Sequence, residues 1–281
     1  MKPSADPIPL DEVKRLELDI LLDVAAFCES HGIRYSLCAG TLLGAVRHRG
    51  FIPWDDDIDI MLPRPDFERF VAEYVSDKPY KVVTNDTDPD YPFPYAAVND
   101  TRTLKIEEKL RPRCTRTLGV NVDVFPLDCV PGDLESATEL YRNIQRRWRR
   151  LSSATCRFGR GKSFVSTFYR NIAIAVYRLL EVLGFDSVRR AVRSSKAIAT
   201  SCNPGPSGRT GVTSIWHYGV RESHPSEVYE GWSDYPFEGH AFKGITRAAD
   251  YLTGMYGPDY MDLPPVEKRN THHTSSCYWK I

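Results

Sequence analysis

The segment Trp54-Asp55-Asp56-Asp57-Ile58-Asp59-Ile60 constrains the fold of this chain more than any other. Ile58 and Ile60 alternate with Asp57 and Asp59, and this period of two predicts a strand that carries both carboxylates on one face. The side-chain origins of the two acids then lie roughly 6–7 Å apart, so their charges repel unless something compensates them. A hard divalent cation that prefers oxygen ligands, Mg²⁺ or as the alternative Mn²⁺, would do so. We therefore expect Asp57 and Asp59 to be metal ligands.

Two other interpretations of this acidic segment compete with a magnesium site. A calcium loop of the EF-hand kind is excluded because the D-x-D-x-D-G spacing and the closing glutamate are absent. A solvated acidic turn accounts for Asp55 and Asp56. It does not explain the isoleucines that are interleaved with Asp57 and Asp59, so we favour the metal site.

Asp123 is the second acidic feature and stands inside the apolar run Val122-Asp123-Val124. Aspartate is disfavoured in strands, so a strand aspartate at this place needs a reason. A third carboxylate beside Asp57 and Asp59 would complete a one- or two-metal site for displacement at phosphorus. This hypothesis requires the two strands to be neighbours, which the sequence does not show.

Gly40-Thr41 precedes the acidic strand and lies between an expected strand and an expected helix. Glycine lets a backbone approach a phosphate closely, and the start of a helix offers free N–H groups and a positive dipole end. The pair alone is an ordinary turn. Followed by a D-x-D strand, it predicts a phosphate-binding turn.

Apolar spacing predicts helices and strands along most of the chain. The expected helices cover 9–30 (ending at Gly32), 42–48, a segment after Pro65, most of 133–200, and 246–256; the expected strands cover 33–39, 58–62, 80–84, 95–98, 103–106, 119–125 and 211–218. We predict three parts: a catalytic core over 1–135, a basic helical insertion over 136–205, and a C-terminal part over 206–281 that completes the core and the active site.

Residues 39–70 resemble the signature of the LicD family, whose members are similar to bacterial phosphocholine transferases and, more distantly, to fukutin-type ribitol-phosphate transferases. The matching pieces occur in order, from Gly40-Thr41-Leu42-Leu43-Gly44 through Arg47-His48 and Gly50 to Trp54 and then the acidic run. Asp123 to Asp128 resembles the second acidic strand of the family. The stretch from Tyr256-Gly257 through Glu267-Lys268-Arg269 to His272 resembles its C-terminal signature.

The resemblance implies an α/β fold (α+β) with a nucleotidyltransferase, polymerase-β-like, mixed-sheet core and a helical insertion. It also implies that Gly40 and Thr41 hold the donor phosphate, that Asp57 and Asp59 bind metal, and that Asp123 completes the site. Arg47 is placed to contact phosphate because guanidinium matches its geometry, although an ordinary surface arginine explains it equally well.

Lys268, Arg269 and His272 form a late basic cluster, and the resemblance favours them as a second phosphate clamp. Solvated tail residues are the alternative interpretation. A metal site that combines His272 and His273 with Cys277 is disfavoured because the sequence contains no second ligand pair.

The expected activity is transfer of a phospho-alcohol, with phosphocholine favoured, from a CDP-activated donor such as CDP-choline. The acceptor is a sugar hydroxyl of a cell-surface glycan or of its lipid-linked precursor. A quaternary ammonium requires an aromatic cage, for which the chain offers Trp216, Tyr218, Tyr229, Trp232 and Tyr235. The alternatives are an NTP-dependent nucleotidyltransferase that makes an activated intermediate and a non-catalytic nucleotide-binding protein.

Charge is segregated along the chain although the net charge is zero. Residues 140–196 carry 14 Lys and Arg but only 2 Asp and Glu. This segment predicts either an amphipathic helical hairpin on anionic lipid or a solvated helix pair over the core. It contains no recognised nucleic-acid motif, so we expect no nucleic-acid partner.

The N-terminus and the cysteines indicate the compartment. The first ten residues lack the apolar segment of a signal peptide, and the seven cysteines are scattered without a C-x-x-C pair, which favours reduced thiols. We expect a cytoplasmic protein, with the inner membrane face as the place of any peripheral contact.

Overall fold

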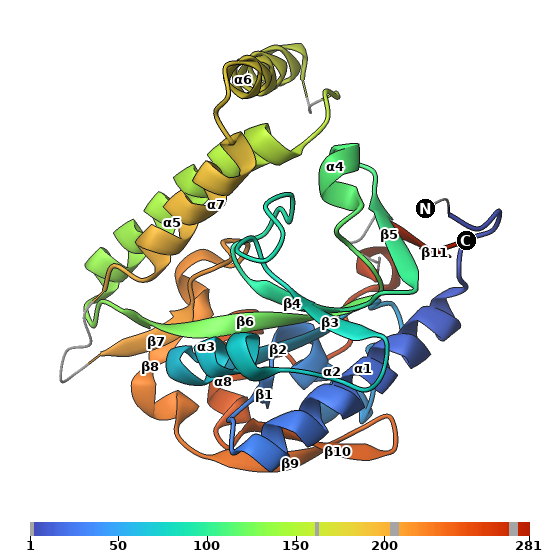
Figure 1. Cartoon of the computed structure of the whole chain (residues 1–281). Coiled ribbons are helices and arrows are strands. Elements are labelled where there is room, and N and C mark those ends of the chain that lie inside the picture. The colour runs from blue at the N-terminus through green and yellow to red at the C-terminus, as the bar shows by residue number, and fades with distance from the viewer. Residues whose placement is uncertain (1–2, 161–162, 203–207, 270–274) are drawn as a thin grey trace.

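A mixed nine-stranded sheet forms the centre of the molecule in the computed structural model (Figure 1), which describes residues 3–160, 163–202, 208–269 and 275–281. Its main path has the order β3-β4-β6-β2-β1-β10-β9, and β7 joins β6 and pairs with β8. The strands of this sheet are β1 (Ser36–Leu37), β2 (Ile58–Pro63), β3 (Tyr80–Val83), β4 (Ala96–Asp100), β6 (Asn121–Val130), β7 (Arg209–Val212), β8 (Ser223–Pro225), β9 (Trp232–Phe237) and β10 (His240–Ile245). A separate two-stranded sheet pairs β5 (Thr103–Glu107) with β11 (Ser275–Trp279).

Both parallel and antiparallel pairs occur in the main sheet. β2 pairs with β6 and β1 with β10 in parallel, whereas the other neighbours are antiparallel. Parallel neighbours need a crossover connection, which the chain between β2 and β6 provides. The mixed-sheet α/β fold predicted from the sequence is confirmed.

The remaining elements are helices that cover the sheet or extend from it. The α-helices are α1 (Leu10–His31), α2 (Ala39–His48), α3 (Arg64–Glu73), α4 (Pro112–Thr115), α5 (Leu134–Thr155), α6 (Phe164–Val182), α7 (Ser187–Ala199) and α8 (Ala248–Tyr256). Short 3-10 turns are η1 (Gly219–Glu222), η2 (Ser226–Tyr229) and η3 (Val266–Lys268).

Helix α1 follows its sequence pattern closely. Leu16, Ile20 and Val24 are buried against the sheet, as the three- and four-residue spacing predicts. Gly32 ends the helix in the left-handed conformation with φ 60°, and its N–H donates to the carbonyls of the last turn. The predicted helix and its glycine stop are therefore confirmed.

The region after α1 corrects one expectation. The strand expected over 33–39 is reduced to β1, because α2 already begins at Ala39. Gly40 and Thr41 consequently lie in the first turn of a helix rather than in a turn that precedes it. Ala39 has φ 45°, and its N–H donates to the hydroxyl of Tyr251 (3.2 Å), so a contact from α8 supports this backbone conformation.

Helices α5, α6 and α7 form the basic segment of the chain, and each has a side-chain cap at its start. Asp133, Ser163 and Asp186 accept hydrogen bonds from the first-turn N–H groups of α5, α6 and α7, respectively. Helices α5 and α7 pack side by side and carry α6 away from the sheet (Figure 1). None of the helices in the described ranges is both long and apolar enough to cross a membrane.

The C-terminal part contributes strands to the main sheet. β7 pairs with β6, and β10 lies between β1 and the edge strand β9. The β9–β10 hairpin was not predicted, although Glu238-Gly239 (φ 50° and 78°) forms the two-residue turn between its strands. The division of the chain into three parts stays a prediction.

The cysteines form no disulfide. The Sγ atoms of Cys129 and Cys202 lie 2.7 Å apart and form a hydrogen-bonded thiol pair.

Candidate active site

The acidic residues of two neighbouring strands meet in the middle of the main sheet. β2 and β6 pair in parallel with Asp59 opposite Asp123. Directly paired residues of adjacent strands project to the same face, and the strands are about 4.8 Å apart. The structure thus places Asp123 beside the D-x-D strand, as the hypothesis of a three-carboxylate site requires.

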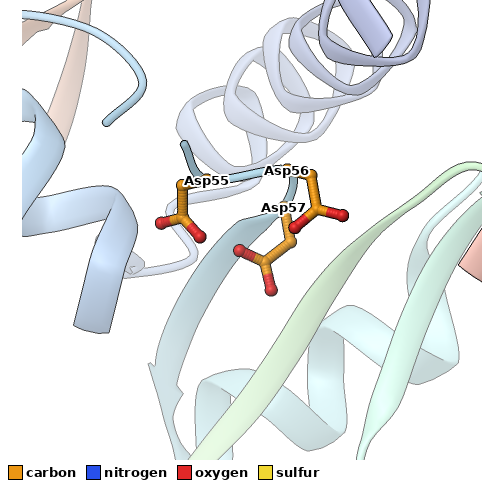
Figure 2. A group of neighbouring side chains, drawn as sticks. All are labelled: Asp55, Asp56 and Asp57. Carbon is orange, nitrogen blue, oxygen red and sulfur yellow. The ribbon is translucent and has the colours of Figure 1, made fainter. Parts of the chain in front are cut away.

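Asp55, Asp56 and Asp57 form a cluster immediately before β2 (Figure 2). Each offers one carboxylate oxygen, and these oxygens lie within 4.8 Å of one another. All three residues are half-buried, so Asp55 and Asp56 are not the fully solvated turn that the sequence suggested. Asp59 and Asp123, also half-buried, are not part of this tight group but follow it along the strands.

Like charges dominate the electrostatics of the site. Burial raises the pKa of Asp59 well above its ordinary value, and the nearby carboxylates of Asp57, Asp123 and Asp55 raise it further, whereas Lys105 opposes the shift. Several half-buried carboxylates in one place are unfavourable without a cation. Since every candidate ligand is a hard oxygen donor, the donor set fits Mg²⁺ or Mn²⁺ rather than a softer metal.

The Gly40-Thr41 turn is in direct contact with the acidic segment. A Cβ atom at Gly40 would lie 2.6 Å from Oδ2 of Asp55, so glycine leaves room for this carboxylate in its present position. Thr41 is buried, and its Oγ1 accepts a hydrogen bond of 2.8 Å from the backbone N–H of Asp59. The first turn of α2 and the start of β2 are therefore held together, which positions Asp59.

Arg47 and Arg269 tie the C-terminal loop to the same region. Nη1 of Arg47 donates to the carbonyl oxygens of Tyr260 (2.8 Å) and Asp262 (3.1 Å). The guanidinium of Arg269 lies over the Trp54 ring at 5.2 Å, next in sequence to the acidic cluster. Contact of either arginine with phosphate stays a prediction. Of the other residues expected in this clamp, the side chain of Lys268 and all of His272 lie outside what the structure describes.

Three residues near the acidic site were missed by the sequence analysis. The first of them, Glu17 of α1, is buried, and this burial is the main reason that its pKa is raised. The positive charge of Lys105 opposes the shift, whereas the carboxylates of Asp57, Asp56 and Asp123 add to it. Nζ of Lys105 donates to Oδ1 of Asn121 (3.4 Å), and Nδ2 of Asn121 donates to Oδ1 of Asp123 (2.6 Å). Lys105 and Asn121 thus orient the Asp123 carboxylate.

A sequence signal for Glu17 existed. It follows Val13 by four residues and precedes Ile20 by three, so it stands inside the apolar stripe of α1 where a charge is unexpected. No comparable signal marks Lys105 or Asn121, because their contact with Asp123 depends on how the strands pack.

The five aromatic residues proposed as a cage do not gather at one point. Tyr229 is buried against Tyr251, and Trp232 and Tyr235 belong to β9. Trp216 stacks on His217 at 5.1 Å. The sequence therefore grouped residues that the fold separates.

Tyr218 is the member of that group that lies in reach of the acidic residues. Its ring forms an edge contact with Tyr256 at 5.6 Å. Burial raises the pKa of Tyr218, a hydrogen bond with Tyr256 opposes this shift, and the charges of Glu222, Asp55 and Asp59 add to it. Tyr256, which the cage hypothesis did not include, completes this aromatic pair.

The comparisons with known proteins agree with this arrangement. The family model described as LicD/FKTN/FKRP, nucleotidyltransferase domain, matches residues 32–146. The chain is 31% identical over 277 residues to the lipopolysaccharide cholinephosphotransferase LicD of Haemophilus influenzae, an alignment that covers 96% of this chain and 98% of that protein.

Two shorter matches are to uncharacterised proteins of Rickettsia. The chain is 43% identical over 69 residues to one from Rickettsia typhi, covering 23% of this chain and 22% of that protein. It is 45% identical over 47 residues to one from Rickettsia prowazekii, covering 17% and 18%. The family model covers the residues of the paired acidic strands, and the relative from Haemophilus matches nearly the whole chain. Together these comparisons show that the chain belongs to the LicD family.

Proposed function

We propose that this protein is a Mg²⁺-dependent transferase that moves phosphocholine from CDP-choline to a sugar hydroxyl of a cell-surface glycan or of its lipid-linked precursor. The observation that carries the proposal is the register of Asp59 beside Asp123, directly after the Asp55–Asp57 cluster. The near full-length similarity to a lipopolysaccharide cholinephosphotransferase supports the transferred group and the class of acceptor.

The proposed reaction forms one bond at phosphorus and breaks another. The acceptor hydroxyl oxygen bonds to the phosphorus of phosphocholine, the bond from that phosphorus to the bridging oxygen breaks, and CMP leaves with the bond electrons. Such transfers depend mainly on positioning and charge neutralisation. Asp123 accepts the proton of the acceptor hydroxyl, because it lies beside Asp59 and is held by Asn121.

Asp57, Asp59 and Asp123 are the proposed metal ligands. When bound, Mg²⁺ would neutralise charge on the donor diphosphate and on the leaving CMP. The Asp55 carboxylate lies close to the Gly40 backbone, at the side of the site next to α2. The three half-buried ligands keep their positions because they lie on or next to paired strands.

The start of α2 and the C-terminal loop are the proposed phosphate contacts. Gly40 and Thr41 belong to the first turn of α2, whose N-terminal dipole end favours an anion. Arg269 places its guanidinium over Trp54, next to the acidic run, and Arg47 binds the C-terminal loop that carries Arg269. Lys268 and His272 are proposed to join them from the sequence resemblance alone.

Tyr218 and Tyr256 are the proposed contacts of the choline headgroup. A quaternary ammonium is attracted to aromatic faces at about 6 Å or less. The edge contact between these two rings, near the charges of Asp55 and Asp59, supports this assignment. Glycerol or ribitol phosphate would gain less from such a pair, since neither carries a cation.

The test is product analysis after incubation of the protein and Mg²⁺ with CDP-choline, CDP-ethanolamine, CDP-glycerol or CDP-ribitol and candidate glycans. We expect CMP release and labelled glycan with CDP-choline alone, dependent on acceptor and metal. Asp59→Ala should abolish both products, whereas Asp77→Ala, at an exposed aspartate away from the site, should not. Pyrophosphate release from an NTP instead of CMP release would show the nucleotidyltransferase alternative to be correct.

A further inference from the structure

Helix α6 contacts the rest of the protein through its polar side. Arg178 donates from Nη1 to the carbonyl of Ala154 (3.0 Å) and from Nη2 to that of Cys156 (2.7 Å). Asn171 accepts a hydrogen bond from the N–H of Gly159 (3.2 Å). Ile174 is the one buried residue among those described in the helix. Polar contacts thus anchor α6, with very little apolar burial.

Glu181 adds the strongest of these anchors. Nη1 and Nη2 of Arg111, at the start of α4, donate to its two carboxylate oxygens at 2.6 and 2.8 Å. Ser187 donates to the same carboxylate at 2.6 Å. Asn171, Ile174, Arg178 and Glu181 recur at three- and four-residue steps, so they define the inner side of the helix.

The opposite side of α6 is apolar and exposed, and the helix itself lies apart from the main sheet (Figure 1). Its residues also recur at three- and four-residue steps and are 46–64% exposed: Val165, Phe168, Ile172, Val176, Leu179 and Leu183, which we call the α6 outer face. A helix that covers a protein core in water shows the reverse arrangement. A contiguous exposed apolar stripe of this kind marks an interaction site.

Exposed arginines lie on the segments next to α6 in the chain and in the fold. Arg149 and Arg150 are exposed in the last turns of α5, which contacts α6. Arg157 and Arg160 are exposed in the connection that leads into α6, and the guanidinium of Arg190 lies over the Phe185 ring at 4.6 Å. Within the described part of the chain, none of these five forms an ion pair with a carboxylate.

We propose that α6 docks on an anionic lipid bilayer, with its outer face among the acyl chains and the exposed arginines of the neighbouring segments at the lipid phosphates. The charge complementarity selects this partner, because basic residues beside an apolar stripe match anionic headgroups above acyl chains. A second copy of the chain fits less well, since a symmetric contact through α6 would bring the same arginines together. This inference stands independently of the proposed transfer reaction.

The docking helix is linked to the candidate active site along the chain. β5 carries Lys105, which orients Asn121 and so Asp123, and the same segment continues to Arg111, the partner of Glu181. Membrane docking would hold the protein where lipid-linked sugars are found.

The experiment is flotation of the full chain with vesicles of phosphatidylcholine alone or with about one-third phosphatidylglycerol. We expect flotation with the anionic vesicles and roughly tenfold weaker binding when salt is raised to shorten the Debye length. The double variant Ile172→Asp with Val176→Asp should lose binding by at least about tenfold. Val75→Asp, at a valine that is 77% exposed elsewhere, should bind like the unmodified protein.

Circular dichroism and gel filtration decide among the other outcomes. If the double variant is unfolded, Arg149→Gln with Arg150→Gln replaces it and should weaken anionic-vesicle binding several-fold. Failure of the unmodified protein to float at low salt would overturn the proposal, as would equal binding by all variants. A dimer in solution that the outer-face variant abolishes, without vesicle binding, would show that a second copy covers α6.

Discussion

The acidic strands and the basic helices of this protein handle charge in opposite ways. Asp59 and Asp123 lie on paired strands, where the backbone register sets their separation. The arginines around α6 lie on exposed helices and connections, and each guanidinium stands at the end of a long side chain. Rigid placement suits ligands that must meet one small cation, whereas flexible, exposed charges suit a broad anionic surface.

The two regions also differ in burial, because the acidic residues are half-buried and the arginines are exposed. Half-buried carboxylates that repel each other destabilise the protein unless a cation is present, so the acidic site is poised for a ligand. Exposed arginines remain solvated and contribute little to folding. The two regions should therefore respond differently to single substitutions, with activity failing in the first and association failing in the second.

The largest expected effect is on catalysis at the strand site. Asp59→Asn keeps the shape of the side chain but removes a proposed metal ligand. We expect the transfer rate to fall roughly a thousandfold, equivalent to about 4 kcal/mol of barrier. The measurement is CMP release with CDP-choline and acceptor at saturating Mg²⁺. A variant that retains near-normal turnover would remove Asp59 from the proposed site.

Lys105→Met tests the residues that orient Asp123. The variant removes the donor to Asn121 and the positive charge between Glu17 and Asp123, while burial otherwise favours an apolar side chain. Loss of such a supporting partner typically costs 10–100-fold in metal affinity or activity. We expect the Mg²⁺ concentration for half-maximal activity to rise within about that range. Lys109→Met, at an exposed lysine of the same segment, is the matched control.

Glu181→Gln tests how firmly the basic segment is attached. Although burial raises the pKa of Glu181, hydrogen bonds from Arg111 and Ser187 lower it below its ordinary value. The ionised form therefore stabilises the fold at neutral pH, and this contribution disappears as pH falls through the lowered pKa. We expect a loss of about 2 kcal/mol in the free energy of unfolding at pH 7, measured by urea titration.

Glu139→Gln is the matched control for that measurement. Its carboxylate pairs with Arg142 and Arg146 but is 47% exposed. Exposed pairs contribute about 0–1 kcal/mol, so this variant should unfold almost like the unmodified protein. Equal effects at Glu139 and Glu181 would contradict a tight anchor at α6.

The smallest expected effect is a gain in stability at the acidic site. Because burial and neighbouring carboxylates raise the pKa of Asp59, its ionised form destabilises the metal-free protein at neutral pH. Asp59→Asn should then unfold at a higher temperature in chelator, by the equivalent of about 1 kcal/mol.

The gain should vanish below about pH 4, where aspartate is protonated in the folded and the unfolded chain. With excess Mg²⁺ the order should reverse, because only the unmodified protein keeps all its proposed ligands. A variant that is less stable than the unmodified protein in chelator would show that Asp59 is compensated by groups within the fold.

Local patterns predicted several elements well. The apolar stripe and Gly32 predicted the range of α1. The alternation of apolar and acidic residues around Asp57 and Asp59 predicted where β2 begins. These elements depend on residues that are only a few positions apart, so they can be recognised from the sequence pattern. The β9–β10 hairpin was missed although its two-residue turn is a local feature. The position of Gly40 inside α2 and the scattered aromatic residues were not obtained, because packing with distant segments sets both of them.

The sequence by itself determined which residues share a face of a strand or helix, since the backbone geometry repeats every 2 or about 3.6 residues. Only the tertiary structure decided which faces meet. It placed Asp123 beside Asp59, brought Glu17 and Lys105 to them, and turned the apolar side of α6 outward. The physical reason is that strand order and helix orientation minimise the free energy of the whole chain, including contacts between segments that are far apart in sequence.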